Sequence, residues 1–170
     1  APTLDAPFNP DGIPLKLQQL KRWAPWRAAY NAKRKKWDKI PVGIGGHGLS
    51  TQRPEQWGSF DDAVAAVRRS KGALAGVGLV MTNLKGLVGI DLDGCVADGV
   101  VADWAQQIVA SAASYTELSP SRKGLRIFLD GDIPADWCNH DVGIECYGGH
   151  EARFLTVTGE VQGRAALTSA

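Results

Sequence analysis

Cysteine is scarce in this sequence, and its pattern excludes a disulfide-stapled fold. The chain has three cysteines, and Cys95, Cys138 and Cys146 are not paired at the spacing of a zinc finger. Disulfide scaffolds of secreted proteins carry an even set of cysteines instead. The pattern therefore predicts free, reduced thiols and a cytoplasmic protein.

Long hydrophobic runs are also missing. Apolar residues make up 44% and charged residues 22% of the 170 positions, which is ordinary for a globular protein, and no apolar run reaches the length of a membrane span. A chain of this size can hold one domain with a real core but not two comfortable ones. We therefore expect one domain and no membrane partner.

Histidine is too sparse to supply a nucleophile-histidine-acid set. His47, His140 and His150 are scattered in Gly-rich or polar segments without obvious partners, which disfavours hydrolysis through an activated serine or cysteine. The Gly-rich stretch 43–48 lacks the Gly-Lys-Ser/Thr ending of a phosphate-binding P-loop. Neither a triad hydrolase nor a P-loop protein is indicated.

The spacing of the apolar residues predicts short strands interrupted by helices. Helices are expected over 15–23, from a cap at Ser59 to about 71, and over 104–113. Strands are expected over 26–30, 37–42, 76–81, 87–93, 115–118, 125–129, 142–147 and 153–157. These elements predict an α+β domain with a mixed or antiparallel sheet and packed helices.

Short turns suggest which strands pair. We expect hairpins from strands 26–30 and 37–42, from strands 76–81 and 87–93, and from the last two strands around Gly148-Gly149. Residues 1–12 are Pro-rich and predict a poorly ordered leader, residues 13–160 the domain, and residues 161–170 a tail or a linker to a further region.

Two carboxylates end one apolar run and mark the centre of a predicted site. In the run from 88 to 93, strand alternation points Asp91 and Asp93 to the same face. Carboxylates this close repel one another, and a hard divalent cation between them relieves the repulsion. The pair therefore predicts a site for Mg²⁺ or Mn²⁺.

A third carboxylate and a polar turn are expected at the same end of the sheet. Glu145 interrupts an apolar strand, where it either pairs or binds metal, or simply alternates onto a wet face. The turn from Ser119 to Arg126 offers hydroxyls, amides and cations that suit a polyphosphate, although an ordinary surface turn has the same composition. Arg153 points either at the same phosphates or at solvent. Metal-bound carboxylates beside a phosphate cradle are the components of two-metal nucleotidyl transfer.

A basic stretch lies in the first hairpin, near several aromatic residues. The template-binding candidates are Lys35, Lys36, Trp37 and Lys39. Cations interleaved with aromatic rings favour a phosphate backbone with stackable bases. A solvated hairpin tip is the alternative for the same residues.

These motifs occur in an order that resembles one protein family. The matching segments are 39–41, 57–63, 76–80, 89–93, 115–121, 124–128, 144–147 and 153–159. Their order from about residue 13 to 159 is similar to the primase-polymerase (prim-pol) domain of phages and plasmids, in the archaeo-eukaryotic primase superfamily.

The resemblance implies a function and a role for each site residue. It implies an RRM-like catalytic core that binds Mg²⁺ or Mn²⁺, a single-stranded DNA template and NTP or dNTP, and that transfers nucleotides to a 3′-hydroxyl as the primase/polymerase domain of a mobile-element replication protein. A helicase domain or protein is an expected partner. Asp91, Asp93 and Glu145 match the catalytic, metal-binding acidic motifs. The implied nucleotide-binding residues are Ser119, Ser121, Lys123, Gly124, Arg126 and Arg153.

One position departs from the family pattern. Arg126 stands where relatives commonly carry a histidine that contacts the incoming nucleotide. Arginine can hold a phosphate through two hydrogen bonds, but it does not titrate near neutral pH. Any role that needs a neutral imidazole is therefore unavailable at this position.

Two other functions fit parts of the sequence. A nucleic-acid-binding replication-initiation module with weakened catalysis would account for Arg126, although intact acidic residues have no use on a surface that only binds phosphates. The stretch from Asp91 to Asp93 also resembles the nucleophile motif of haloacid-dehalogenase-like phosphatases, in which Asp91 would attack a phosphoryl group. That fold begins with the motif and needs a late acidic pair, and this sequence has neither feature.

Overall fold

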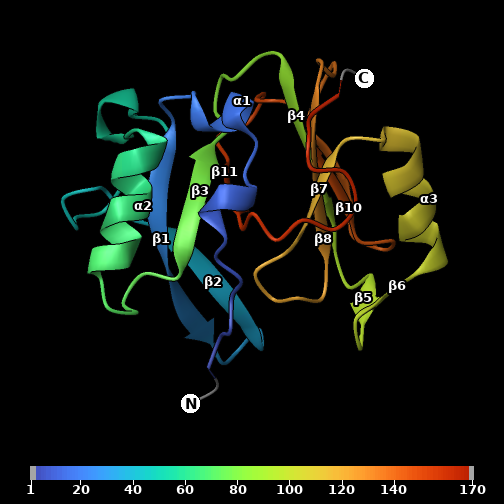
Figure 1. Cartoon of the computed structure of the whole chain (residues 1–170), viewed down its shortest axis with the longest axis horizontal. Helices are drawn as coiled ribbons and strands as arrows, with labels where there is room; N and C mark the ends of the chain where they lie inside the picture. Colours follow the sequence, from blue (N-terminus) through green and yellow to red (C-terminus); the bar gives the residue numbers. More distant parts are fainter. Residues whose placement is uncertain (1–2, 169–170) are drawn as a thin grey trace.

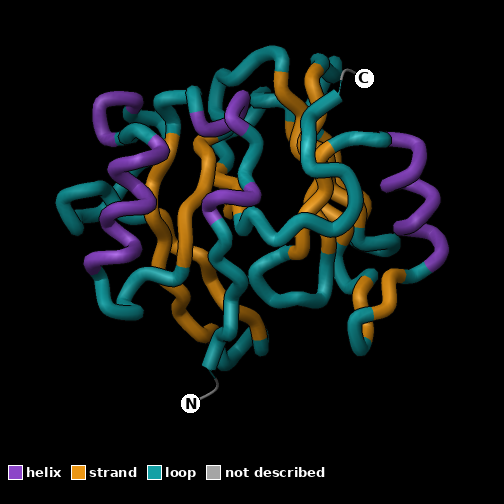
Figure 2. The backbone as a smooth tube through the Cα atoms, in the orientation of Figure 1, coloured by secondary structure: helices purple, strands orange, loops and turns teal. Residues whose placement is uncertain are grey.

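Two antiparallel sheets stand between two outer helices in the computed structural model, which describes residues 3–168 (Figure 1). Figure 2 shows the same arrangement coloured by secondary structure. Helix α2 (Phe60–Arg69) covers the outer face of one sheet, and helix α3 (Asp103–Ala112) covers the outer face of the other. The predicted α+β class with antiparallel strands is confirmed.

The first sheet has the strand order β11-β3-β1-β2, and every pairing in it is antiparallel. Its strands are β1 (Trp23–Asn31), β2 (Lys36–Pro41), β3 (Gly76–Val80) and β11 (Phe154–Val157). The predicted basic hairpin is confirmed, because β1 and β2 pair around the turn at residues 32–35.

The second sheet has the order β7-β8-β4-β10-β9 and is also antiparallel throughout. Its strands are β4 (Leu87–Leu92), β7 (Tyr115–Leu118), β8 (Leu125–Asp130), β9 (Trp137–Asn139) and β10 (Ile144–Tyr147). Two very short strands, β5 (Val96–Ala97) and β6 (Val100–Val101), pair with each other just before α3. The sequence analysis missed β5, β6 and β9, which are three residues long at most.

The remaining helical elements are short. They are α1 (Leu15–Gln18) and the 3₁₀ turns η1 (Pro10–Gly12) and η2 (Pro54–Gln56). Among the described residues, no helix is both long and apolar enough to cross a membrane.

Helix α2 begins where its sequence predicts. The Ser59 hydroxyl accepts a hydrogen bond from the amide of Asp62 at 3.1 Å, which satisfies one of the free donors at the helix start. Acidic residues occupy the first turn and Arg68 and Arg69 the last, as the helix dipole favours. The apolar face of α2 packs on β1 and β3 and orients the first sheet.

Alternation along the strands divides the core into two clusters. In β8, Leu125, Ile127 and Leu129 point toward α3, whereas Phe128 joins a larger cluster that contains residues of α2 and of both sheets. Because both neighbours of Arg126 point toward α3, Arg126 itself faces the first sheet. The polar residues described below lie on this inner face.

Two predicted hairpins are wrong. Strand β3 pairs with β1 and β11, not with β4, and β11 pairs with β3, not with β10. Both connections cross from one sheet to the other, and they bond to each other where Met81 N–H donates to Arg153 and Asn83 N–H donates to Gly149. Apolar spacing identifies a strand but not its partner, because pairing is decided between distant segments.

The two ends of the chain contact the domain. Asn9 N–H donates to the carbonyl of Thr158, and Thr168 N–H donates to the Ser114 hydroxyl next to β7. The predicted boundaries at 12 and 160 stay predictions, and residues 1–2 and 169–170 of the predicted leader and tail lie outside the described residues.

Glycine is required at position 159, where the chain leaves β11. The φ of Gly159 is +72°, and a Cβ atom there would lie 1.8 Å from the carbonyl oxygen of Asn9. We expect Gly159→Ala to lower the free energy of unfolding by about 3 kcal/mol or more, since the left-handed backbone costs about 1–2 kcal/mol before the clash is relieved. Urea denaturation measures the change.

Gly72 provides the matched control. Its φ is +92°, but nothing lies within 4 Å of the position of its Cβ, so Gly72→Ala carries the backbone cost alone. Equal losses of stability in the two variants would show that the contact with Asn9 is unimportant.

Candidate active site

Four charged residues form a row across the inner face of the second sheet. The strand register places Glu117 of β7 opposite Arg126 of β8, Arg126 opposite Asp91 of β4, and Asp91 opposite Glu145 of β10. Residues directly opposite in antiparallel strands share a face and lie about 5 Å apart. The sheet therefore brings the predicted Asp91 and Glu145 together and adds Glu117, which the sequence analysis missed.

Arg126 holds Asp91 through two hydrogen bonds. Its Nε donates to Asp91 Oδ1 at 2.6 Å and its Nη2 donates to Asp91 Oδ2 at 2.7 Å, while Nη1 donates to the hydroxyl of Thr156 at 2.8 Å and to its carbonyl. Burial is the largest single influence and disfavours the Arg126 charge, but Asp91, Glu117 and Asp93 together outweigh it, so the pKa of Arg126 lies above its ordinary value. The four hydrogen bonds thus hold both side chains in a fixed orientation.

Glu117 is a fully buried carboxylate beside this pair. Its oxygens accept hydrogen bonds from the Tyr115 hydroxyl and from the backbone amides of Thr158 and Gly159 at 2.6–3.1 Å. Burial raises the pKa of Glu117, while these donors and the nearby Arg126 charge act in the opposite direction. Glu117 therefore fastens the end of β11 to β7 and adds negative charge behind Arg126.

Asp93 follows β4 and lies at the edge of the row. Partial burial, followed by the charges of Asp91 and Glu145, raises the pKa of Asp93, which indicates that the three carboxylates are close enough to repel. The turn from Ser119 to Gly124 packs against this point, because a Cβ on Gly124 would lie 2.6 Å from the carbonyl oxygen of Leu92. The predicted phosphate turn is thus next to Asp93.

The hydroxyls of this turn bond within the turn itself. The Ser119 hydroxyl accepts from Gly124 N–H at 3.1 Å, and the Ser121 hydroxyl accepts from Lys123 N–H at 3.3 Å. The Lys123 side chain is exposed. The turn is therefore preformed, and the nucleotide contacts predicted for it stay predictions.

Glu145 is connected to Arg153 through a residue that the sequence analysis missed. The Tyr147 hydroxyl donates to Glu145, and the Arg153 guanidinium stacks over the Tyr147 ring at 4.5 Å from the ring centre. Burial, then the hydrogen bond with Glu145, raises the pKa of Tyr147. Tyr147 lies two residues after Glu145 in β10, so strand alternation was the signal that could have identified it.

His140 has partners that its sequence position did not reveal. Its Nδ1 lies 3.5 Å from Glu145 Oε1, and its Nε2 lies 3.5 Å from the thiol of Cys138. The expectation that the histidines lack partners is therefore wrong for His140. The contact depends on β9, because the register of β9 and β10 places Cys138 opposite Glu145.

Two lysines of the basic hairpin lie within electrostatic reach of the carboxylates. Burial of the ammonium group, followed by the charge of Arg126, lowers the pKa of Lys39, and Asp91 and Asp93 oppose this shift. The charges of Lys39 and Lys36 in turn oppose the raised pKa of Asp93. The hairpin and the carboxylates therefore belong to one electrostatic site.

The other two template-binding candidates differ in their exposure. Trp37 is half-buried against Tyr30, with ring centres 5.2 Å apart, and Lys35 is exposed in the turn. Binding of template by Lys35, Lys36, Trp37 and Lys39 stays a prediction.

Carboxylate oxygens are suitable ligands for a hard divalent cation, but their placement among the described residues does not form a complete metal site. Within residues 3–168, no three His, Cys, Asp or Glu side chains form a group that could hold a metal ion. However, Mg²⁺ commonly uses one or two protein carboxylates together with substrate phosphates. Asp93 and Glu145 fit such a role, and each Asp91 oxygen keeps a second lone pair beyond its bond to Arg126.

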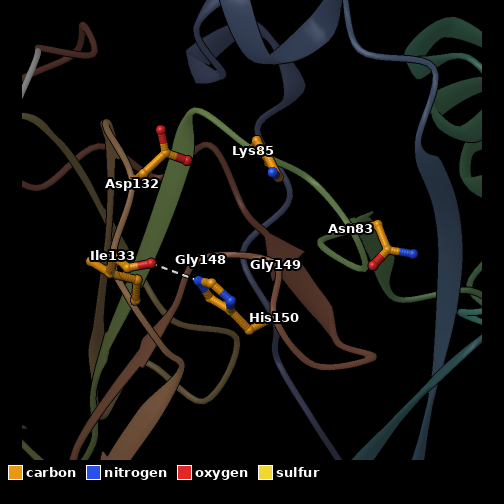
Figure 3. Close-up of a pocket in the computed structure, with 7 residues that line it drawn as sticks. All are labelled: Asn83, Lys85, Asp132, Ile133, Gly148, Gly149 and His150. Atoms are coloured by element: carbon orange, nitrogen blue, oxygen red, sulfur yellow. Dashed lines mark hydrogen bonds between the residues drawn. The ribbon is translucent and has the colours of Figure 1, made fainter.

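Three cavities of the structure lie away from the carboxylates. A cavity of about 460 Å³ opens at the other end of β4, where His150 lies 2.6 Å from the carbonyl of Ile133 (Figure 3). Two more, of about 660 and 500 Å³, adjoin the β1–β2 hairpin. None of the three is lined by Asp91, Asp93 or Glu145. The carboxylate row is therefore not enclosed in any of these cavities.

A comparison of the sequence with curated proteins found a relative. A DNA primase-polymerase from Nitratiruptor phage NrS-1 is 34% identical to the chain over 154 residues, which is 85% of this chain. This chain is a homologue of part of a phage primase-polymerase. The alignment covers 20% of that phage protein, so the chain spans about one fifth of its relative. No protein-family model matches the chain.

Removing the charge of Glu117 tests its structural role. Glu117→Gln places an amide N–H₂ against backbone N–H donors in a buried position, so we expect the free energy of unfolding to fall by about 1–3 kcal/mol. Denaturation in urea measures the loss. The control, Glu55→Gln, changes an exposed carboxylate and should stay within about 0.5 kcal/mol of the parent. A Glu117 variant as stable as the control would contradict the role.

Proposed function

We propose that the chain is the template-dependent primase/polymerase domain of a mobile-element replication protein. It transfers a nucleotide from NTP or dNTP to a 3′-hydroxyl, and its catalytic core is RRM-like. The observation that carries the proposal is the meeting of Asp91, Asp93 and Glu145 at one end of the second sheet, in a chain homologous to a phage primase-polymerase.

The carboxylates act on the attacking hydroxyl. Its oxygen bonds to the α-phosphorus of the bound nucleotide, the bond to the leaving pyrophosphate breaks, and the hydroxyl proton must be accepted. Asp93 is exposed beside the site, so it is the proposed proton acceptor, through the oxygen that does not hold the cation. A divalent cation on Asp93 and Glu145, with Asp91 as the third predicted ligand, would supply charge stabilisation for the triphosphate.

The nucleotide lies between the preformed turn and Arg153. The turn residues Ser119, Ser121, Lys123 and Gly124 adjoin Asp93, and Arg153 reaches Glu145 through Tyr147. Arg153 Nε is a buried nitrogen that lacks a hydrogen-bond partner within residues 3–168. A buried donor without a partner is costly, so a phosphate oxygen at this point would satisfy it.

The template strand follows the basic hairpin. Lys36 and Lys39 lie within electrostatic reach of the carboxylates, so a strand bound along β2 would reach the site of transfer. The three cysteines are free thiols, as expected of a protein in the reducing cytoplasm of a host cell. A helicase domain or protein is the proposed partner that would supply single-stranded template.

Loss of the carboxylates tests the enzymatic proposal. We expect Asp91→Ala with Asp93→Ala, and Asp93→Ala alone, to reduce primer extension by at least about 100-fold, because the proton acceptor and cation ligands are removed. Affinity for single-stranded DNA should fall by no more than about twofold, since these side chains repel phosphates and do not bind them. Extension with all four dNTPs and Mg²⁺ or Mn²⁺, and fluorescence anisotropy, provide the two measurements.

One control and two outcomes separate the alternative functions. Glu55→Ala, a change of one exposed carboxylate in η2, should extend primers like the parent. If the parent protein binds DNA but extends no primer with either cation, the chain is a binding module. If it instead hydrolyses a phosphomonoester through an acyl-phosphate on Asp91, it is a phosphatase.

Charge reversal in the hairpin tests the template path. We expect Lys35→Glu with Lys36→Glu to weaken binding of single-stranded DNA by about 10-fold or more and to reduce the slope of log K against log salt by about one to two, because phosphate contacts release counterions. Anisotropy titrations at several salt concentrations, without divalent cations, measure both. The control, Arg68→Glu with Arg69→Glu, makes the same charge change on α2. Equal slopes in the two variants would exclude a specific path along the hairpin.

A further inference from the structure

Every guanidinium nitrogen of Arg126 already has a hydrogen-bond partner within the protein. Nε and Nη2 bond to Asp91, and Nη1 bonds to Thr156. Only 7% of the Arg126 side chain is exposed, whereas 40% of the Arg153 side chain is exposed. Arg153 Nη2 donates to the exposed Glu151 at 3.1 Å, and Arg153 Nε has no hydrogen-bond partner among residues 3–168. Of the two arginines predicted to contact the nucleotide, Arg153 is available for such a contact and Arg126 is not.

The surroundings hold the Arg126 guanidinium in place. Thr156 belongs to β11 of the first sheet, so its bonds to Arg126 join the two sheets at the site. Glu117 lies opposite Arg126 on β7 and presents a second negative charge to it. Moving the guanidinium to a substrate would leave unpaired oxygens on the partly buried Asp91 and the buried Thr156, which is costly.

Resting on the proposed function, we infer that Arg126 is a positioning residue that acts through Asp91 rather than a ligand of the nucleotide phosphates. The two parallel hydrogen bonds fix the plane of the carboxylate. One lone pair on each Asp91 oxygen stays free for the reaction centre. In other proteins, hydrogen bonds from neighbouring residues orient the carboxylates that bind metals in the same way.

A Lys substitution separates the two roles. Arg126→Lys keeps the charge but loses the planar fork, so it cannot hold both Asp91 oxygens. We expect kcat for primer extension to fall by about 10- to 100-fold while KM for dNTP changes by less than about threefold. Arg153→Lys should instead raise KM for dNTP by more than about fivefold. A rise in KM with unchanged kcat for Arg126→Lys would overturn the inference.

Thr156→Val provides a second variant that leaves both charges in place. It removes the hydroxyl that anchors Nη1 and does not contact Asp91. We expect a smaller loss of kcat, about three- to tenfold, again without a change in KM. Thermal melts monitored by circular dichroism report whether each variant is folded. Full kcat in a folded Thr156 variant would show that the anchor does not position Asp91.

Two measurements remain informative if the parent protein incorporates no nucleotide. Calorimetry with inorganic tripolyphosphate in EDTA should give equal affinities for the parent and Arg126→Lys, and a weaker affinity for Arg153→Lys. Unfolding free energies of Arg126→Lys, Asp91→Asn and the double variant should be non-additive, because the two side chains are in contact. Weaker tripolyphosphate binding by Arg126→Lys would refute the positioning role, and so would strictly additive losses of unfolding free energy. Either result can be obtained even when primer extension, the test of the proposed function, gives no activity.

Discussion

The ion pair between Arg126 and Asp91 connects the features on which the site depends. It joins β4, the central strand of the second sheet, to the neighbouring strand β8, and Thr156 links it to β11 at the edge of the first sheet. A charged pair that is taken out of water is tolerated only when its hydrogen bonds are satisfied, and all three guanidinium nitrogens have partners here. The carboxylate end of β4 therefore has one defined orientation.

The acidic and basic residues of the site come from different sheets. The second sheet supplies the acidic residues and the preformed turn next to Asp93, and the first sheet supplies the basic hairpin whose lysines act on those acids. Because the inter-sheet core contains Phe128 and Tyr147, packing of large side chains fixes the spacing between the acidic and basic surfaces.

Local sequence patterns predicted most of the helices and strands and some of the site residues. Strand alternation placed Asp91 and Asp93 on one face, and the Ser59 cap located the start of α2, because both depend on a few neighbouring residues. The hairpin between β3 and β4 was predicted wrongly, because the apolar residues of a strand do not identify the strand with which it pairs. The site residue Glu117 was missed for the same reason, since its importance comes from the register of β7 and β8.

Local patterns in the sequence identified the α+β class, most strands, and Asp91 and Glu145 as strand carboxylates, whereas the predicted strand residue Asp93 lies just after β4. These properties are local, because they follow from spacing, capping and turn residues. Only the tertiary structure decided that Arg126 faces Asp91 rather than solvent, that Tyr147 lies between Glu145 and Arg153, and that the lysines of the hairpin reach the acids. Such contacts depend on how strands distant in the chain pair and on how the two sheets pack.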